Sequence, residues 1–79
     1  MRIEQVLEKS IKDNNDSIEL LTYRIEGMKK SIPLQNDKIS ELKLAEELTK
    51  AKDRVMFHKG CVEAYTDILN LINKALKKE

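Results

Sequence analysis

Apolar residues recur along this chain at helical spacing, and the stretch from Leu48 to Leu76 is the most strongly patterned. In this stretch three neighbouring rows of apolar side chains each advance by alternating steps of three and four residues. The rows are Val62, Tyr65, Leu69, Ile72 and Leu76; Cys61, Tyr65, Ile68, Ile72 and Ala75; and Phe57, Cys61, Ala64, Ile68, Leu71 and Ala75. At about 100° per residue they cover roughly half of the helix circumference, whereas a helix that rests on one neighbour needs a stripe about 100° wide. The pattern therefore predicts a helix that packs against more than one partner.

The first part of the chain, residues 2–31, carries a narrower apolar row. Its members are Ile3, Leu7, Ile11, Asn14, Ile18, Leu21, Ile25, Met28 and Ile32. After the first step the spacing alternates between four and three, which is typical of a coiled-coil seam. Asn14 is the one polar member, and it lies among Asp and Asn residues that favour helix starts and turns. A break at Asn14 is one interpretation. The unbroken spacing favours the other, a single helix with a polar layer.

Residues 31–37 are predicted to reverse the chain direction. Pro33 disfavours a helical conformation at Ile32 and lacks a backbone N–H donor. Asn36 or Asp37 can cap the helix that follows, because their side-chain oxygens accept hydrogen bonds from free backbone N–H groups. Pro33 could alternatively occupy the first turn of that helix.

Residues 37–78 contain no proline, and their only glycine is Gly60, so they are predicted to form one helix about 60 Å long. One feature complicates this prediction, because Ile39 and Leu42 lie nearly opposite the row that begins at Leu44 and Leu48. A helix break near Asp53 would explain the change of side and would give three helices. We favour the continuous helix, and hence an all-α fold in which residues 1–79 form a single antiparallel helical hairpin.

The composition narrows the possible partners. The 79 residues include 15 Lys and Arg and 14 Asp and Glu, with a net charge of +1, and the two signs alternate along the chain. This is typical of solvated helices and argues against a nucleic-acid-binding surface, since Tyr23 is the only aromatic residue expected to face outward. The longest apolar run is Val55 to Phe57, so no membrane span is expected. A lone Cys61 and the lack of a signal-peptide pattern favour a soluble, cytoplasmic protein.

A chain of this length buries only a modest core, so we expect a homo-oligomer. In a hairpin, a first helix of about thirty residues would cover the second helix only to about residue 65. The exposed residues would then form an interface comprising Tyr65, Ile68, Leu69, Ile72 and Leu76. Two-fold pairing into a dimeric four-helix bundle is the simplest way to cover them.

Three polar residues project into the apolar stripe of the second helix, namely Arg54, His58 and Tyr65. They could pair with Glu or Asp of a neighbouring helix, because an unpaired charge away from water is costly. They could instead bind an anionic small molecule at a subunit junction, with help from Lys50 or Lys59. His58 and Cys61 offer two metal ligands at i and i+3, but zinc needs four, so neither a metal nor another cofactor is expected.

The sequence contains no set of residues suited to nucleophilic catalysis and no glycine-rich phosphate loop, so we do not expect an enzyme. The leading hypothesis is a small oligomeric helical interaction protein, an adaptor or inhibitor with a protein partner, such as phages and mobile elements often encode. The alternative hypothesis is a protein that sequesters an anionic ligand through Arg54, His58 and Tyr65.

Overall fold

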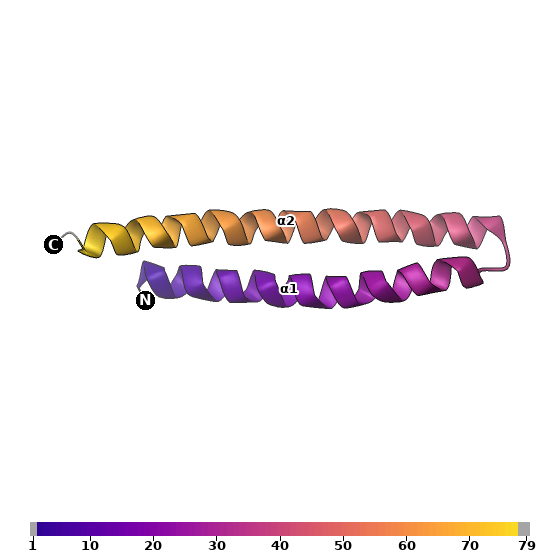
Figure 1. Ribbon diagram of the computed structural model, residues 1–79, viewed down its shortest axis with the longest axis horizontal. Helices are drawn as coiled ribbons and strands as arrows, with labels where there is room; N and C mark the ends of the chain where they lie inside the picture. The colour runs from indigo at the N-terminus through magenta and orange to yellow at the C-terminus, as the bar shows by residue number, and fades with distance from the viewer. Residues whose placement is uncertain (1, 78–79) are drawn as a thin grey trace.

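A computed structural model describes residues 2–77 as two long helices that lie side by side and antiparallel (Figure 1). Helix α1 spans Ile3–Ser31, the short 3₁₀ turn η1 spans Ile32–Leu34, and α2 spans Lys38–Lys77. The described chain contains no strand, so the all-α fold and the helical hairpin are confirmed. Position 78, where the second helix was expected to end, lies outside the described residues, as do positions 1 and 79.

Both helices are continuous at the positions where a break was considered. Helix α1 passes through Asn14, whose side-chain nitrogen donates a hydrogen bond of 2.7 Å to the backbone oxygen of Ser10 one turn earlier. Helix α2 passes through Asp53 without interruption, so the three-helix alternative is wrong. Gly27 and Gly60 also lie within helices, and a methyl group added at either would have no neighbour within 4 Å. Close packing inside the hairpin is therefore not the reason for either glycine.

The chain reverses between Ser31 and Lys38. Pro33 lies in η1 and not in the first turn of α2. Asp37 caps α2, because its Oδ1 atom accepts a 2.7 Å hydrogen bond from the backbone N–H of Ser40 and its Oδ2 atom accepts one of 3.2 Å from the Ser40 hydroxyl. The N-cap is therefore Asp37, the second of the two candidates.

The core of the hairpin is a thin line of contact between the helices. Ile25 of α1 and Ala51 and Val55 of α2 are buried together, and four half-buried residues pack around them. These four are Ile18, Leu21, Met28 and Leu48. Leu7 is buried nearer the N-terminus of α1.

The contact face of α2 follows one heptad row, which we call the inner seam. Its members are Leu44, Leu48, Ala51, Val55, His58, Val62, Tyr65, Leu69, Ile72 and Leu76. The steps alternate between four and three throughout, so α2 needs no break to stay in contact with α1. Ile39 and Leu42 are off this row and exposed. The apolar residues change from one side of α2 to the other near residue 44 because the inner seam begins only at Leu44.

The hairpin is elongated and poorly buried. Its extents are 64 × 16 × 15 Å and its radius of gyration is 18.1 Å, against about 12 Å for a compact domain of this length. Its accessible surface of 6593 Å² exceeds the roughly 4900 Å² expected for a compact monomer of 9.2 kDa. About a third more surface is left in water than a monomeric domain of this mass usually exposes.

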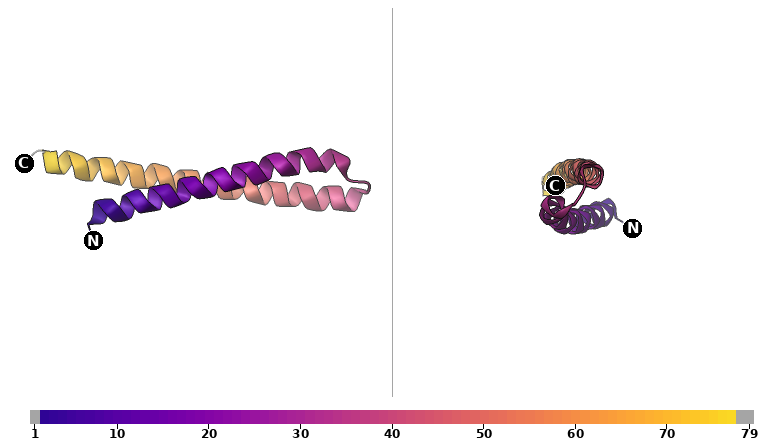
Figure 2. Two further views of the ribbon diagram at one scale, coloured as in Figure 1. Left: turned by 90° about the horizontal axis from the view of Figure 1, so that it is seen from below. Right: turned by 90° about the vertical axis from the view of Figure 1, so that its right-hand side faces the viewer.

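The end of α2 extends past the N-terminus of α1, and the two helices cross at a shallow angle (Figures 1 and 2). The overhang is shorter than expected. Leu69 and Ile72 are half-buried, and Leu76 shares a surface hollow with Ile3 of α1. The expectation that α1 covers α2 only to about residue 65 is therefore wrong, because the seams of the two helices stay in register to the beginning of α1. Neither helix within residues 2–77 holds a stretch long and apolar enough to cross a membrane.

The cap at Asp37 predicts how acid affects the start of α2. Hydrogen bonds from the Ser40 backbone and hydroxyl lower the pKa of Asp37 below its ordinary value of 3.8. A lowered folded-state pKa means that the carboxylate stabilises the fold above pH 3.8 and that this contribution is lost as the pH falls further. Thermal melts followed by circular dichroism should show Asp37→Ala melting a few degrees below the wild type at pH 7, with a smaller gap at pH 2.

The matched control is Asp37→Ser, which keeps a capping oxygen without a titrating group. It should melt close to the wild type at pH 7. Equal melting temperatures for wild type and Asp37→Ala at pH 7 would show that the cap contributes nothing.

Candidate functional site

The structure places Arg54 and His58 on the rim of one groove between the helices. This open groove of about 760 Å³ is bordered by α1 residues from Ser17 to Ser31 and by Leu44, Arg54 and His58 of α2. Arg24 of α1 lies on the same rim. Tyr65 is half-buried further along α2 and is not among the lining residues. Two of the three predicted ligand-binding residues therefore come together, and Arg24 joins them.

His58 meets the one polar residue of the α1 seam. Its Nδ1 atom lies 2.7 Å from the Oδ1 atom of Asn14, so the polar members of the two seams form a single layer. The Asn14 amide nitrogen donates to the Ser10 carbonyl oxygen, which can only accept, and the amide orientation follows from this. Asn14 Oδ1 is therefore the acceptor, and His58 Nδ1 must carry the proton.

The position of this proton determines which hydrogen-bonding group His58 presents to a ligand in the groove. With the proton on Nδ1, a neutral ring has a lone pair on Nε2, which accepts hydrogen bonds and disfavours an anion. A protonated ring donates hydrogen bonds from both nitrogens and attracts an anion. The Phe57 and His58 rings also pack in a T-shaped arrangement, with ring centroids 5.5 Å apart at an interplanar angle of 72°.

Arg54 finds no carboxylate partner in the hairpin. Within residues 2–77 the only salt bridge joins Lys29 to Glu26 at 3.7 Å. Arg24 and Arg54 also flank a second hollow of about 440 Å³, together with Lys50 and Glu47. The pairing of Arg54 with an acidic side chain of a neighbouring helix, one of the two alternatives from the sequence, is therefore absent between α1 and α2 within residues 2–77 of a single chain.

Sequence reasoning missed Arg24, because a helical wheel of α1 alone places it beside the seam like many other surface cations. Only the antiparallel register brings it to the same groove as Arg54. Register depends on which layers of the two helices meet. The sequence indicated this register only through Asn14 and His58, the polar residues that could pair between the two seams.

A second apolar row, which we call the outer seam, lies about 100° around α2 from the inner seam, because each of its members directly precedes a member of the inner seam. Its members are Phe57, Cys61, Ala64, Ile68, Leu71 and Ala75. Phe57 and Leu71 are each 67% exposed and Ile68 is 43% exposed. The steps again alternate between four and three, so one helix carries two coiled-coil faces.

The five predicted interface residues divide between these faces. Ile68 lies on the outer seam, whereas Tyr65, Leu69 and Ile72 are half-buried on the inner seam. Leu76 ends the inner seam and is 57% exposed. Cys61 has a free thiol on the outer seam, while His58 belongs to the inner one. In the described part of the chain no three His, Cys, Asp or Glu side chains gather as metal ligands.

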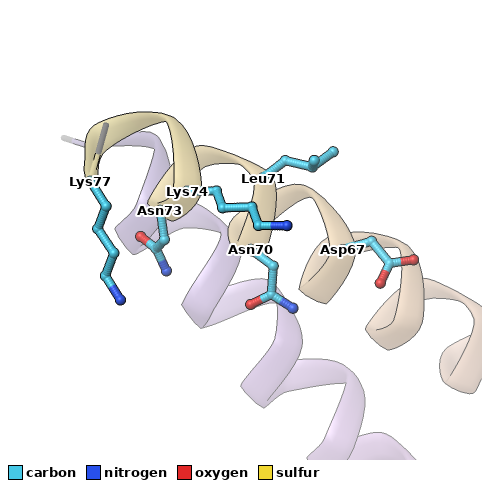
Figure 3. Close-up of a pocket in the computed structure, with 6 residues that line it drawn as sticks. All are labelled: Asp67, Asn70, Leu71, Asn73, Lys74 and Lys77. Carbon is cyan, nitrogen blue, oxygen red and sulfur yellow. The ribbon is translucent and has the colours of Figure 1, made fainter. Parts of the chain in front are cut away.

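A further hollow of about 560 Å³ lies on the last turns of α2 (Figure 3). All of its lining residues come from this one helix, and they are Asp67, Asn70, Leu71, Asn73, Lys74 and Lys77. Asn70, Asn73 and Lys77 point to one side of the helix, and Leu71 points to the opposite side (Figure 3). The hollow is a shallow space between exposed side chains of one helix, all of them polar except Leu71.

Comparison of the chain with known protein families, curated proteins and solved structures finds no match. The function must therefore be argued from the described geometry.

The layer of Asn14 and His58 predicts strong coupling between these two residues. Asn14→Leu or His58→Leu alone leaves a half-buried polar group facing an aliphatic side chain, and each should lower the free energy of unfolding by about 1 kcal/mol. The double variant restores an apolar layer and should be at least as stable as the wild type. Urea denaturation of the four proteins gives the coupling energy. Additive effects of the two substitutions would show that the side chains act independently.

Proposed function

We propose that this chain is a non-enzymatic helical interaction protein that acts through the outer seam of α2. The observation that carries the proposal is an apolar row of coiled-coil spacing which the hairpin itself leaves uncovered. Phe57, Ile68 and Leu71 give this row three large side chains, and 43% to 67% of their surface lies in water. Burying the exposed part of each would contribute roughly half of the 1.5–3 kcal/mol that burial of a fully exposed side chain of this size provides.

The low burial of the hairpin supports the same proposal. Only four side chains of the described residues are buried, and no large one is buried completely. A two-helix hairpin of this kind gains little from its own core. An additional helix on the outer seam would place α2 at the centre of a bundle, which fits its unusually wide apolar stripe.

A second candidate function is the sequestration of an anionic small molecule. Arg24, Arg54 and His58 converge on one groove, and neither arginine forms a salt bridge within residues 2–77. Apolar residues such as Leu21 and Met28 border the same groove, so a ligand with an anionic group and an apolar body would suit it best. Native mass spectrometry of protein purified from its host distinguishes the candidates: a retained small anion favours the second, and a retained protein chain favours the first.

Substitutions on two exposed leucines test the leading proposal. Leu71 lies on the outer seam and is 67% exposed, whereas Leu42 is off both seams and 62% exposed. In sedimentation equilibrium at micromolar concentration, Leu71→Asp should weaken association about a hundredfold or more, because a symmetric assembly loses the burial of this side chain twice. Leu42→Asp is the matched control and should leave association unchanged.

Circular dichroism should show both variants still helical, because neither leucine contributes to the inner seam. Leu69→Asp would be a poor choice for this test, since Leu69 is half-buried on the inner seam and its loss also disturbs the hairpin. If Leu71→Asp has no effect on binding to any chain, whether a copy or a foreign partner, the outer seam is not an interaction surface.

A further inference from the structure

We infer that the outer seam binds the outer seam of a second copy of this chain, with the two α2 helices antiparallel and related by a two-fold axis. The inference rests on the proposed function, and it adds the identity of the partner and the way the helices pair. The order of large and small side chains along the seam carries it.

The outer seam reads large, small, small, large, large, small from Phe57 to Ala75. When the row is reversed, every large position meets a small one. An antiparallel pair in full register would place Phe57 opposite Ala75, Cys61 opposite Leu71, and Ala64 opposite Ile68 of the second copy. Facing layers that alternate large and small side chains interdigitate at close helix separation without voids.

No other pairing of the row with itself fills space as evenly. A parallel pair would set every residue against its own counterpart. This gives three crowded layers, at Phe57, Ile68 and Leu71, and three layers with voids, at Cys61, Ala64 and Ala75. Voids and crowded layers both cost stability. An antiparallel pair shifted by one heptad would keep only four of the six layers.

The area that a second copy would bury is also comparable with the excess accessible surface of the hairpin. The hairpin exposes 6593 Å², and this exceeds the area of a compact monomer of its mass by about 1700 Å². Stable protein interfaces bury about 800 Å² on each partner, so one further chain on the outer seam removes a large part of this excess. A second copy is always present at the concentration of the first, and the seam is complementary to itself.

The position of Asp67 distinguishes the full register from a shifted one. It flanks the outer seam, and in the full register it lies beside the two-fold axis, next to Asp67 of the second copy. In the two registers shifted by one heptad it would instead lie near Lys74 or near Gly60 of the second copy. Flanking charges of this kind set register in coiled coils. Asp67→Asn should therefore tighten the dimer a few fold at low salt, whereas tightening would not occur in either shifted register.

Thiol crosslinking tests the pairing directly, because the chain has a single cysteine. In the full register Cys61 lies opposite position 71 of the second copy, whereas the two Cys61 residues lie ten residues apart along the axis, about 15 Å. Leu71→Cys should therefore give a covalent dimer with a short thiol-to-thiol reagent. The wild type should not, and neither should Leu71→Cys combined with Cys61→Ser. A second pair, Phe57→Cys with Ala75→Cys in the Cys61→Ser background, should also crosslink between chains.

Each other outcome overturns the inference in a distinguishable way. Crosslinking of wild-type Cys61 to itself would indicate parallel or differently registered helices, although Leu71→Asp would still show whether the outer seam binds. A dimer in sedimentation with no crosslink in either cysteine pair would mean that another surface associates. A monomer at every concentration would leave only a foreign partner for the outer seam, and the proposed function would then depend on that partner alone.

Discussion

The layer formed by Asn14 and His58 fixes the register on which the rest of the hairpin depends. Two coiled-coil faces of Leu, Ile, Val and Ala can shift by one heptad with little loss of packing energy, because each layer resembles the next. A slip here would place Asn14 and His58 against aliphatic side chains and would break their 2.7 Å contact. The same register brings Arg24 and Arg54 to the edge of one hollow and leaves the last turns of α2 beyond the start of α1.

Helix α2 has two seams, and this explains why its apolar stripe is so wide. The inner seam is used inside the hairpin, while the outer seam faces water in a single chain. The two meet where the Phe57 ring contacts His58, so the first large residue of the outer seam lies against the polar layer of the inner one. Covering Phe57 would therefore also shield the layer that fixes the hairpin register, and shielding from water strengthens a hydrogen bond.

The fold was largely predictable, and the site was predictable only in part. Two uninterrupted heptad rows separated by Pro33 lead directly to a hairpin, and Asp37 has the chemistry of a cap. The reach of α1 along α2 was misjudged, because it depends on pairing Asn14 with His58, two residues 44 positions apart. Arg24 was missed for the same reason. A wheel shows which residues share a face of one helix, but it contains no information about which layer of the other helix they meet.

Small-angle X-ray scattering at micromolar concentration would show whether α2 forms the core of a two-chain bundle. Antiparallel pairing centred near residue 66 offsets the two hairpins, so that the hairpin turns lie at opposite ends. The particle should have twice the 9.2 kDa mass of the chain and a maximum dimension of roughly 90 Å at 1.5 Å per helical residue. A particle of 9.2 kDa with a length near 64 Å would rule out the two-chain bundle, because the hairpin would then be stable with its outer seam in water.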